Sequence, residues 1–448
     1  MKRVKIIGAG LAGCEAAWQC AQREVPVELY EMRPVKPTAA HKTGDFAELV
    51  CSNSLKSESE NTAPWLLKEE MRRCGSLLLK LARETQVPAG HALAVDRDLF
   101  ANKVTEALSR EPLINVIREE VTRIDAGEED CLTVVATGPL TSDALSQEIA
   151  RLSGSDHLYF YDSISPIVEA DSIDLSKVYF AARYDKGDAD YINCPFTREE
   201  YDTFYDALTA AQTVEGHDWE KLNYFEGCLP IEEIGRRGRD TLRFGPMKPV
   251  GLNDPKTGRM PYAVVQLRRE NLRADSYNIV GFQNHLKYGE QAKVLRLIPG
   301  LESAKFLRYG QIHRNTYINA PSLLTELLHL KLHPNVFFTG QISGVEGYTE
   351  SIATGMLAGI YAANIARGLA AAPPPRETAL GSLVHYICHA AAKNFQPANI
   401  TFDLLPQLDE QTRRRIRDKK LRHRQVCENA LKACAQWFEQ VSGYAVKT

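Results

Sequence analysis

The feature of this 448-residue chain that most constrains its fold is a glycine-rich turn near the N-terminus. An apolar stretch, VKII, ends at residue 7, GAGLAG follows, and the small-residue stretch CEAAWQCAQ comes next. In a strand–turn–helix, Gly8 would make the tight turn, Gly10 would let the backbone approach a pyrophosphate, and Gly13 would let helix and strand pack closely. The spacing therefore predicts a Rossmann-like dinucleotide-binding turn. Its predicted cofactor-binding residues are Gly8, Ala9, Gly10, Leu11, Ala12 and Gly13.

Three later segments extend this pattern and favour FAD over NAD. The strand VPVELYE ends at Glu31, where a carboxylate can bind a ribose hydroxyl. The apolar strand LTVVATG ends in Thr137 and Gly138, as does a strand that returns to the dinucleotide in two-dinucleotide flavoproteins. Residues 335–359, which include Gly340, give a strand, a glycine turn and a small-residue helix that could point at an isoalloxazine. An ordinary βα unit is the alternative for that last segment.

The chain is too long for one ordinary core, and its two ends look like parts of one domain. We predict an α/β fold, with a Rossmann-like two-dinucleotide FAD-binding domain at 1–160 and 310–448. An α+β insertion domain at 161–309 splits it in sequence. In the insert, YAVVQLRRE and YNIVGFQN read as strands, and Thr197 with Glu200 forms a candidate capping box for a helix.

Composition excludes several classes of protein. Apolar content of 44% and charged content of 25% are those of a soluble globular protein. No apolar run approaches the roughly 18 residues of a membrane span, so we expect no membrane partner and a cytoplasmic location. The ten cysteines contain no C-x-x-C pair, and the histidines show no zinc-finger spacing. We therefore expect neither disulfides nor a metal, and most cysteines should be small buried hydrophobes.

One cysteine stands where a helix could activate it. In FEGCLPIEEIGRRGRD, Pro230 suits the first turn of a helix, which would put Cys228 just before the helix N-terminus. That position lowers a thiol pKa, and the three arginines that follow would lower it further if they fold back. Glu232 and Glu233 oppose this effect. A buried structural cysteine is the alternative.

A second cysteine lies in a predicted loop. Cys51 ends an apolar stretch in FAELVCSNSLKSES, and small polar residues follow it. The loop comes after the second strand of the dinucleotide fold, so it could reach the cofactor. An inert loop cysteine is the alternative.

The net charge is −3, but basic residues are concentrated near the C-terminus. From Arg413 to Arg424 the sequence RRRIRDKKLRHR has eight Lys or Arg against one Asp. A solvated helix face and a phosphate-contacting surface are both compatible with such a run.

Several stretches resemble one family, the folate- and FAD-dependent tRNA (uracil-5-)methyltransferases. They are GAGLAGCEAA, LVCSNSLKS, YFEGCLPIEE, RFGPMKPVGL, QLRRENL, HRNTYINAP and NFQPANITFDLLP, and they run from residue 4 to about 406. The two cysteine motifs and GPMKPVGL are the specific ones. GAGLAGCEAA alone is also similar to the longer flavoprotein of wobble-uridine modification.

The resemblance implies methylation of C5 of a uridine in the tRNA T-loop. Methylenetetrahydrofolate would give the carbon, reduced FAD the electrons, and NAD(P)H would reduce the flavin again. By the same resemblance Cys228 is the nucleophile at uracil C6. Cys51 is the second catalytic thiol, either as a base or as a group that handles the methylene. The same chemistry on ribosomal RNA is an alternative, as is a flavin-bearing RNA-binding protein without turnover; a disulfide reductase lacks its C-x-x-x-x-C pair.

Other residues are candidates for contacts with the substrates. His313 and His285 are candidates to stack on the folate pterin, with a structural histidine as the alternative for each. No stable protein partner is expected. The candidate RNA-binding residues are Arg236, Arg237, Arg239, Lys248, Arg413, Arg414 and Arg415.

Overall fold

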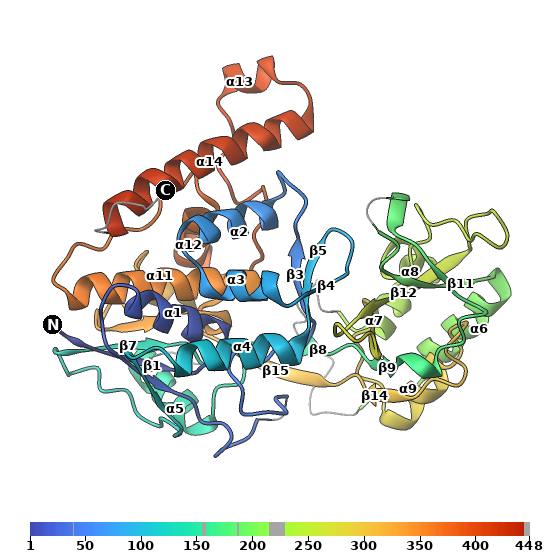
Figure 1. The fold of residues 1–448 in the computed structure, drawn as a ribbon, viewed down its shortest axis with the longest axis horizontal. Helices are drawn as coiled ribbons and strands as arrows, with labels where there is room; N and C mark the ends of the chain where they lie inside the picture. The colour runs from blue at the N-terminus through green and yellow to red at the C-terminus, as the bar shows by residue number, and fades with distance from the viewer. Residues whose placement is uncertain (39, 155–157, 186–187, 215–228, 443–448) are drawn as a thin grey trace.

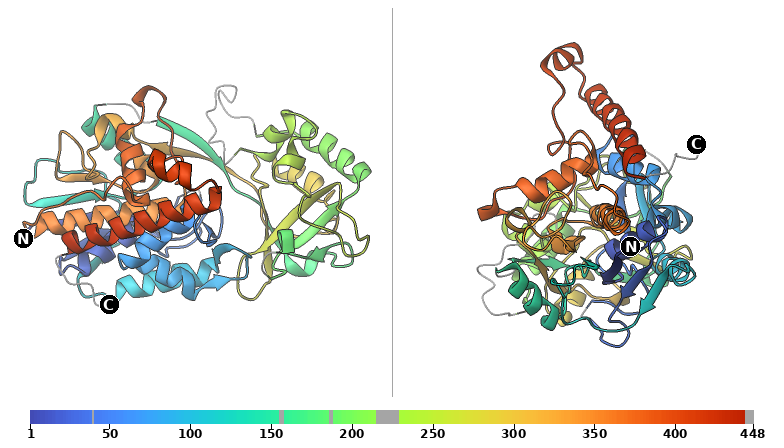
Figure 2. Two further views of the ribbon diagram at one scale, coloured as in Figure 1. Left: turned by 90° about the horizontal axis from the view of Figure 1, so that it is seen from above. Right: turned by 90° about the vertical axis from the view of Figure 1, so that its left-hand side faces the viewer.

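The computed structural model describes residues 1–38, 40–154, 158–185, 188–214 and 229–442, and these form two lobes that lie side by side (Figures 1 and 2). The larger lobe contains both ends of the chain, and the smaller one contains its middle. Each lobe has its own cluster of buried apolar residues. The predicted α/β class is confirmed, whereas the boundaries of the two predicted domains stay a prediction.

A five-stranded parallel sheet forms the centre of the larger lobe, in the order β16-β7-β1-β2-β6. Every residue of β7 is buried, as expected for a parallel strand covered by helices on both faces. Strand β1, near the N-terminus, and strand β16, from the C-terminal part of the chain, thus belong to the same sheet. The strands are β1 (Arg3–Ile7), β2 (Val27–Tyr30), β6 (Ile114–Ile117), β7 (Cys131–Val135) and β16 (Val336–Phe338).

Helices cover this sheet, and two of them, α1 and α11, pack closely where glycines of α11 meet alanines of α1. A Cβ added at Gly355 of α11 would lie 2.3 Å from the carbonyl oxygen of Ala12, and one at Gly359 would lie 2.5 Å from that of Ala16. These small residues let the two helix backbones approach and fix their N-termini beside each other. The helices of the lobe are α1 (Leu11–Ala21), α2 (Ala63–Arg73), α3 (Leu77–Glu84), α4 (Arg97–Ser109), α5 (Asp143–Ser153), α10 (Ala320–Leu323), α11 (Tyr348–Ala366), α12 (Ala379–His389), α13 (Glu410–Arg415) and α14 (Lys419–Ser442).

The smaller lobe is built on a six-stranded sheet in the order β10-β11-β12-β13-β9-β14. Its helix α6 (Arg198–Ala210) begins with the predicted capping box, since Thr197 and Glu200 each bond the other's backbone N–H. The strands are β9 (Ile167–Glu169), β10 (Tyr179–Phe180), β11 (Ile192–Phe196), β12 (Ala263–Arg269), β13 (Ser276–Ile279) and β14 (Phe306–Arg308). The other helices are α7 (Ile231–Arg236), α8 (Thr241–Phe244) and α9 (Tyr288–Leu295).

Two small sheets lie at the junction of the lobes. The antiparallel pair β8 (Leu158–Ser163) and β15 (Ile312–Tyr317) carries the chain into and out of the smaller lobe. The other sheet has the order β3-β5-β4, with β3 (Ser54–Ser57), β4 (Gln86–Val87) and β5 (Ala92–Val95).

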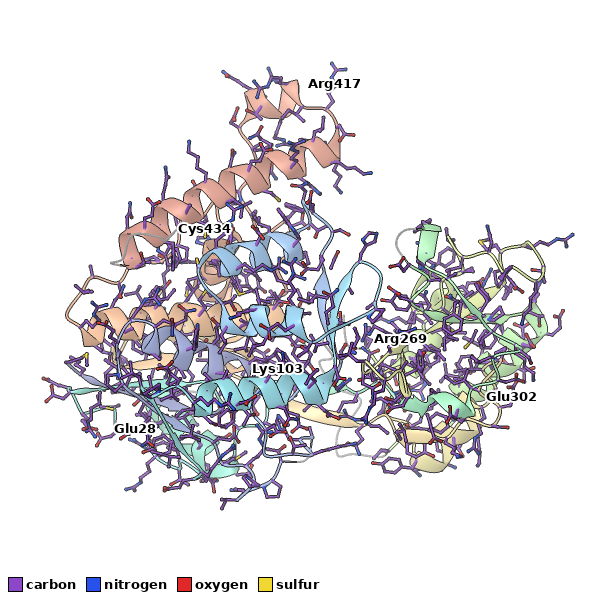
Figure 3. The ribbon with its side chains drawn as sticks, in the orientation of Figure 1. Glu28, Lys103, Arg269, Glu302, Arg417 and Cys434 are labelled. Atoms are coloured by element: carbon purple, nitrogen blue, oxygen red, sulfur yellow. The ribbon has the colours of Figure 1, made fainter. Side chains whose placement is uncertain are left out.

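The C-terminal basic residues stand away from the body of the molecule. Helix α13 and the first turns of α14 project beyond the larger lobe, and Figure 3 shows Arg417 at their outer tip. We call residues 410–424 the basic arm. Among the described residues, no helix is both long and apolar enough to cross a membrane.

Candidate functional site

A cavity of about 500 Å³ lies at the carboxyl ends of the parallel strands and extends to the smaller lobe. This is where an open α/β sheet ordinarily binds its ligand. Ala9 and Gly13 are not among the lining residues. The predicted site residues that do line the cavity are Gly8, Gly10, Leu11, Ala12, Glu31, Cys51, Thr137, Gly138 and Gly340.

The glycine turn has the backbone geometry that its spacing predicts. Gly8 has a φ of +102°, which few other residues adopt. A Cβ at Gly13 would lie 1.8 Å from the carbonyl oxygen of Gly8, so helix and turn are in direct contact there. A Cβ at Gly10 would meet nothing within 4 Å, because this residue faces the cavity.

Two helix N-termini border the cavity. Helix α1 begins after Gly10 with no side-chain cap and no acidic residue in its first turn. Helix α11 begins after Gly347, and Gly347, Tyr348 and Ser351 all line the cavity. Uncapped N–H groups and the helix dipole favour anions at such positions. The end of α1 is thus suited to a phosphate group.

Glu31 forms part of the cavity wall as a charged carboxylate. Its oxygens accept hydrogen bonds from the backbone N–H of Ala9 and from the backbone and Nε of Arg33, each at 3.0 Å. Burial raises the pKa of Glu31, but the hydrogen bonds and charge of Arg33 outweigh it and hold that pKa below its usual value. The carboxylate is therefore fixed in place before any ligand binds.

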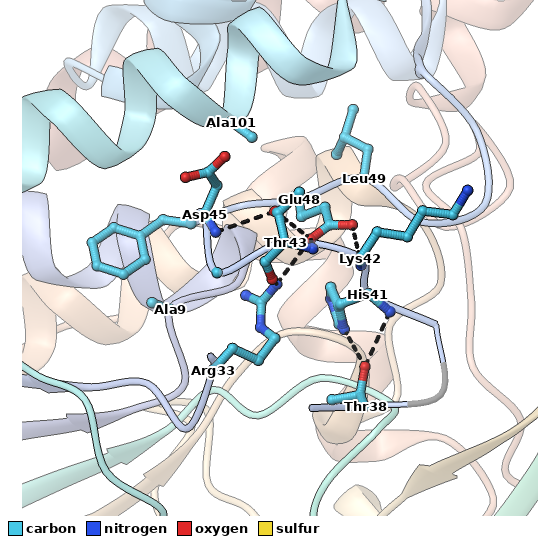
Figure 4. Close-up of polar contacts among 12 residues, drawn as sticks. Ala9, Arg33, Thr38, His41, Lys42, Thr43, Asp45, Glu48, Leu49 and Ala101 are labelled. Atoms are coloured by element: carbon cyan, nitrogen blue, oxygen red, sulfur yellow. Dashed lines mark hydrogen bonds and ion pairs between the residues drawn. The ribbon is translucent and has the colours of Figure 1, made fainter. Parts of the chain in front are cut away.

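The loop after Glu31 is held by its own polar contacts (Figure 4). Glu48 accepts hydrogen bonds from the backbone N–H of Lys42 at 2.8 Å and from the hydroxyl of Thr43 at 2.8 Å, and it pairs with Arg33 at 3.1 Å. Thr38 and His41 are joined through Oγ1 and Nδ1 at 2.7 Å. This network closes one side of the cavity and leads the chain to Cys51.

Cys51 is held by a tyrosine from the distant helix α11. The Oη of Tyr348 accepts hydrogen bonds from the backbone N–H groups of Cys51 at 2.8 Å and Ser52 at 3.1 Å. Burial raises the pKa of Tyr348, and the charge of Cys51 adds to the effect, so the phenol stays neutral. A thiol on the cavity wall is thereby positioned at the N-terminus of α11.

Two arginines bring positive charge to the same place. The guanidinium of Arg97 donates to the carbonyl oxygen of Leu49 at 2.8 Å and pairs with Glu270 of the smaller lobe. Burial lowers the pKa of Arg97, but Glu270, Tyr348 and Cys51 together raise it above its ordinary value. Burial and Arg97 lower the pKa of Arg308, whereas Cys51 raises it. A thiolate at Cys51 would be stabilised by both guanidinium groups.

The smaller lobe contributes polar groups to the cavity. Arg268 donates to Asn53 Oδ1 at 2.9 Å and to Ser52 Oγ at 2.8 Å, which ties β12 to the cysteine loop. Figure 3 shows its neighbour Arg269 where the lobes meet. Asn278 lines the cavity at 3% exposure, and its Nδ2 has no partner among the described residues. An unpaired buried amide is costly, so the site fits a ligand that accepts a hydrogen bond there.

Sequence reasoning missed Tyr348, Arg97, Arg268 and Asn278 as site residues. Tyr348 is 297 positions from Cys51 in the chain, and Arg268 is 216 positions from Ser52. The only local signal was that Tyr348 directly follows the glycine turn of the predicted second flavin segment. The others are ordinary polar residues on strands and helices until the fold brings them together.

The second predicted thiol, Cys228, lies outside the described residues. The expected helix does follow it, since α7 begins directly after Pro230. Glu232 is fully buried there and accepts a hydrogen bond from the backbone N–H of His285 at 2.8 Å.

The two candidate folate-stacking histidines have different placements. His285 is buried, with its Nδ1 2.7 Å from Glu232, and it is not among the residues that line the cavity. His313 belongs to β15, and its side chain lies outside the described part of the structure. Stacking on the pterin stays a prediction for both residues.

The candidate RNA-binding residues fall into two groups. Arg239 pairs with Asp202 at 2.7 Å and with Asp206, and its guanidinium lies 4.5 Å from the centre of the Tyr205 ring. Arg236 pairs with Glu233. Lys248 is half-buried, and its backbone carbonyl accepts a hydrogen bond from Arg183 at 2.9 Å.

In the basic arm, Arg413, Arg414 and Arg415 are exposed, as are Arg236 and Arg239. Arg413 donates to Gln407 at 2.6 Å, and Arg414 pairs with Glu410 one turn away. The arm therefore presents more uncompensated positive charge than the arginines of the smaller lobe.

Known proteins resemble this chain over nearly its whole length. The glucose-inhibited division protein A family matches residues 3–370. A methylenetetrahydrofolate--tRNA-(uracil-5-)-methyltransferase TrmFO from Koribacter versatilis is 76% identical over 97% of this chain and 98% of its own length. Proteins of the same name from Solibacter usitatus and Enterococcus faecalis are 63% and 54% identical, over 97% and 98% of this chain and 98% and 99% of their own lengths. The crystal structure of GidA from Aquifex aeolicus matches the fold with a TM-score of 0.73 at 16% identity, covering 100% of this chain and 74% of that one.

Proposed function

The chain belongs to the glucose-inhibited division protein A family and, within it, to the methylenetetrahydrofolate--tRNA-(uracil-5-)-methyltransferases. From this we propose that it methylates C5 of a uridine in the T-loop of tRNA, with methylenetetrahydrofolate as the carbon donor. The observation that carries the proposal is the cavity. It brings together the uncapped N-terminus of α1, the carboxylate of Glu31 and the thiol of Cys51, whose backbone is held by Tyr348.

FAD would bind along the cavity wall. The N-terminus of α1 would face the pyrophosphate, and Glu31 would accept hydrogen bonds from a ribose. The N-terminus of α11, with Gly340 before it, would lie near the ring system. When bound and reduced by NAD(P)H, FAD supplies the hydride that turns a methylene group into a methyl group.

The two thiols would divide the work on the uracil ring. The thiolate of Cys228 adds to C6, which makes C5 nucleophilic enough to attack the methylene carbon. A base would then remove the proton from C5, so that the carbon–nitrogen bond to the folate breaks and tetrahydrofolate leaves. Once the methylene group left on C5 has been reduced, expulsion of the Cys228 thiolate from C6 would restore the ring. Cys51 acts as that base or handles the methylene carbon, and Arg97 and Arg308 favour its thiolate form.

RNA would reach the cavity by base flipping, because a stacked uracil is inaccessible to buried groups. The exposed arginines of the basic arm would hold phosphates, as would Lys248 to a lesser extent. A cytoplasmic location fits this chemistry, since no disulfide joins the described cysteines and both thiols must stay reduced.

The test is methylation of an unmodified tRNA transcript with carbon-labelled methylenetetrahydrofolate and NAD(P)H. We expect labelled 5-methyluridine at one T-loop position, and no product when S-adenosylmethionine replaces the folate. Label in a ribosomal RNA fragment but not in tRNA would overturn the assigned substrate. Purified protein that carries no flavin and cannot be reconstituted with FAD would overturn the assigned cofactor.

A further inference from the structure

A cluster of two histidines and one glutamate lies outside the cavity, on the face of α12. His385 and His389 are four residues apart on this helix, so their side chains lie on the same face. Their ring centres are 4.6 Å apart. Glu326, from the loop after α10, reaches between them, with its Oε1 3.0 Å from His389 Nε2 and 3.9 Å from His385 Nδ1. None of the three lines the catalytic cavity.

We propose that His385, His389 and Glu326 bind a divalent transition-metal ion of the Zn²⁺ or Ni²⁺ class. Three ligand atoms, one from each residue, lie within 4.8 Å of one another. Ligands at roughly 2.1 Å from a tetrahedral ion are about 3.4 Å apart, so small side-chain rotations would complete the shell. Imidazole nitrogen and carboxylate oxygen are the ligands that such ions accept, with water in the fourth position.

The glutamate loop is held so that its carboxylate stays near the helix. The Cys388 thiol donates to the carbonyl oxygen of Thr325 at 3.2 Å, directly beside Glu326 in the chain. The backbone N–H of Leu328 bonds the same carbonyl at 2.8 Å, and Leu324 pairs with Leu330 across the loop. The leucines are buried, whereas the three ligand side chains are half-exposed and accessible to an ion.

The bound ion would join the C-terminal end of α12 to the loop that follows α10. It would act as a structural staple between these two segments. Sequence spacing indicated no metal, since Glu326 lies 63 positions before His389. Only the fold brings the third ligand to the histidine pair.

The test is calorimetric titration of Ni²⁺ into the full-length, tag-free flavoprotein. We expect one ion per chain at micromolar affinity, with at least tenfold weaker binding in His389→Ala and in Glu326→Gln. His333→Ala, which removes a surface imidazole outside the cluster, is the matched control and should bind within about twofold of wild type.

Thermal unfolding gives a second readout that does not depend on activity. Saturating Ni²⁺ should raise the Tm of the wild type by about 2 to 4 °C and leave that of His389→Ala unchanged. Equal Ni²⁺ affinity in the wild type and in a His385→Ala/His389→Ala double variant would overturn the proposal. So would an equal Tm rise in the two proteins.

Discussion

The cavity and the basic arm carry their functional residues in opposite ways. In the cavity, Cys51 is fixed by a hydrogen bond from its backbone N–H to Tyr348, and Glu31 is fixed by four donors. In the arm, Arg413, Arg414 and Arg415 are exposed, and the side chains of the first two contact Gln407 and Glu410, both close by in the sequence. The difference follows from the tasks, since bond-making requires atoms held in place, whereas phosphate binding depends mainly on net charge.

This contrast also separates arginines that look alike in sequence. Arg239 follows the Cys228 motif and is compensated by Asp202 and Asp206. The arm has eight Lys or Arg against one Asp between Arg413 and Arg424. Mutations in the cavity should therefore change the rate of chemistry, and mutations in the arm should change the binding of RNA.

The largest effect is expected for Cys51→Ala. Methylation under saturating tRNA should fall by roughly 10³-fold, because the positioned thiol is lost while the cavity wall is kept. Flavin absorbance and tRNA affinity should stay at wild-type levels. Cys194→Ala, at a buried cysteine in β11, is the control and should keep its methylation rate. A Cys51→Ala enzyme with near-normal turnover would remove this residue from the chemistry.

Gly13→Ala tests how strictly the cavity depends on its backbone. The added methyl group would lie 1.8 Å from the Gly8 carbonyl oxygen, so α1 must shift, at about 3 kcal/mol of unfolding free energy. Gly10→Ala is the matched variant, since its methyl group meets no atom within 4 Å. It should lower FAD affinity and leave the Tm of the flavin-free protein unchanged. Equal Tm values for all three proteins would contradict the close contact at Gly13.

Tyr348→Phe should have a smaller effect on the same site. It leaves the backbone N–H groups of Cys51 and Ser52 without their acceptor, which costs about 1 to 3 kcal/mol. We expect a drop in turnover of roughly tenfold, with KM for tRNA unchanged. A change in KM alone would show that the phenol acts in RNA binding instead.

The arm should give the smallest effect on turnover and the clearest effect on binding. Replacing Arg413, Arg414 and Arg415 by Gln should weaken tRNA binding by about tenfold. It should also reduce the slope of log affinity against log salt by about 2. Arg239→Gln should change affinity less than about threefold, because its charge is already paired. An equal loss in both proteins would erase the contrast between the two groups of arginines.

The glycine turn, with the strand before it and the helix after it, could be predicted because its signals are local. Gly8, Gly10 and Gly13 specify a backbone path within six residues, and that path is the one observed. The capping box at Thr197 is equally local and was confirmed. In both cases the residues of the sequence motif also make the structural contact: Gly13 packs against Gly8, and Thr197 bonds to Glu200.

The environment of Cys51 could not be predicted, because it is assembled from segments far apart in the chain. Tyr348 comes from the last helix against the parallel sheet, and Glu270 comes from the smaller lobe. Charge runs were an equally weak guide. On the basis of charge, Arg236 and Arg239 were predicted to bind RNA together with the arm. In the structure, however, both arginines pair with nearby carboxylates.

The account is tested most directly by single-turnover methylation at both saturating and limiting tRNA. Wild type, Cys51→Ala and the triple arm variant would be compared in the same assay. We predict that Cys51→Ala is slow at both tRNA concentrations, whereas the arm variant recovers the wild-type rate once tRNA is saturating. An arm variant that stays slow at saturating tRNA, or a Cys51→Ala enzyme that recovers, would contradict the separation of chemistry in the cavity from RNA binding on the arm.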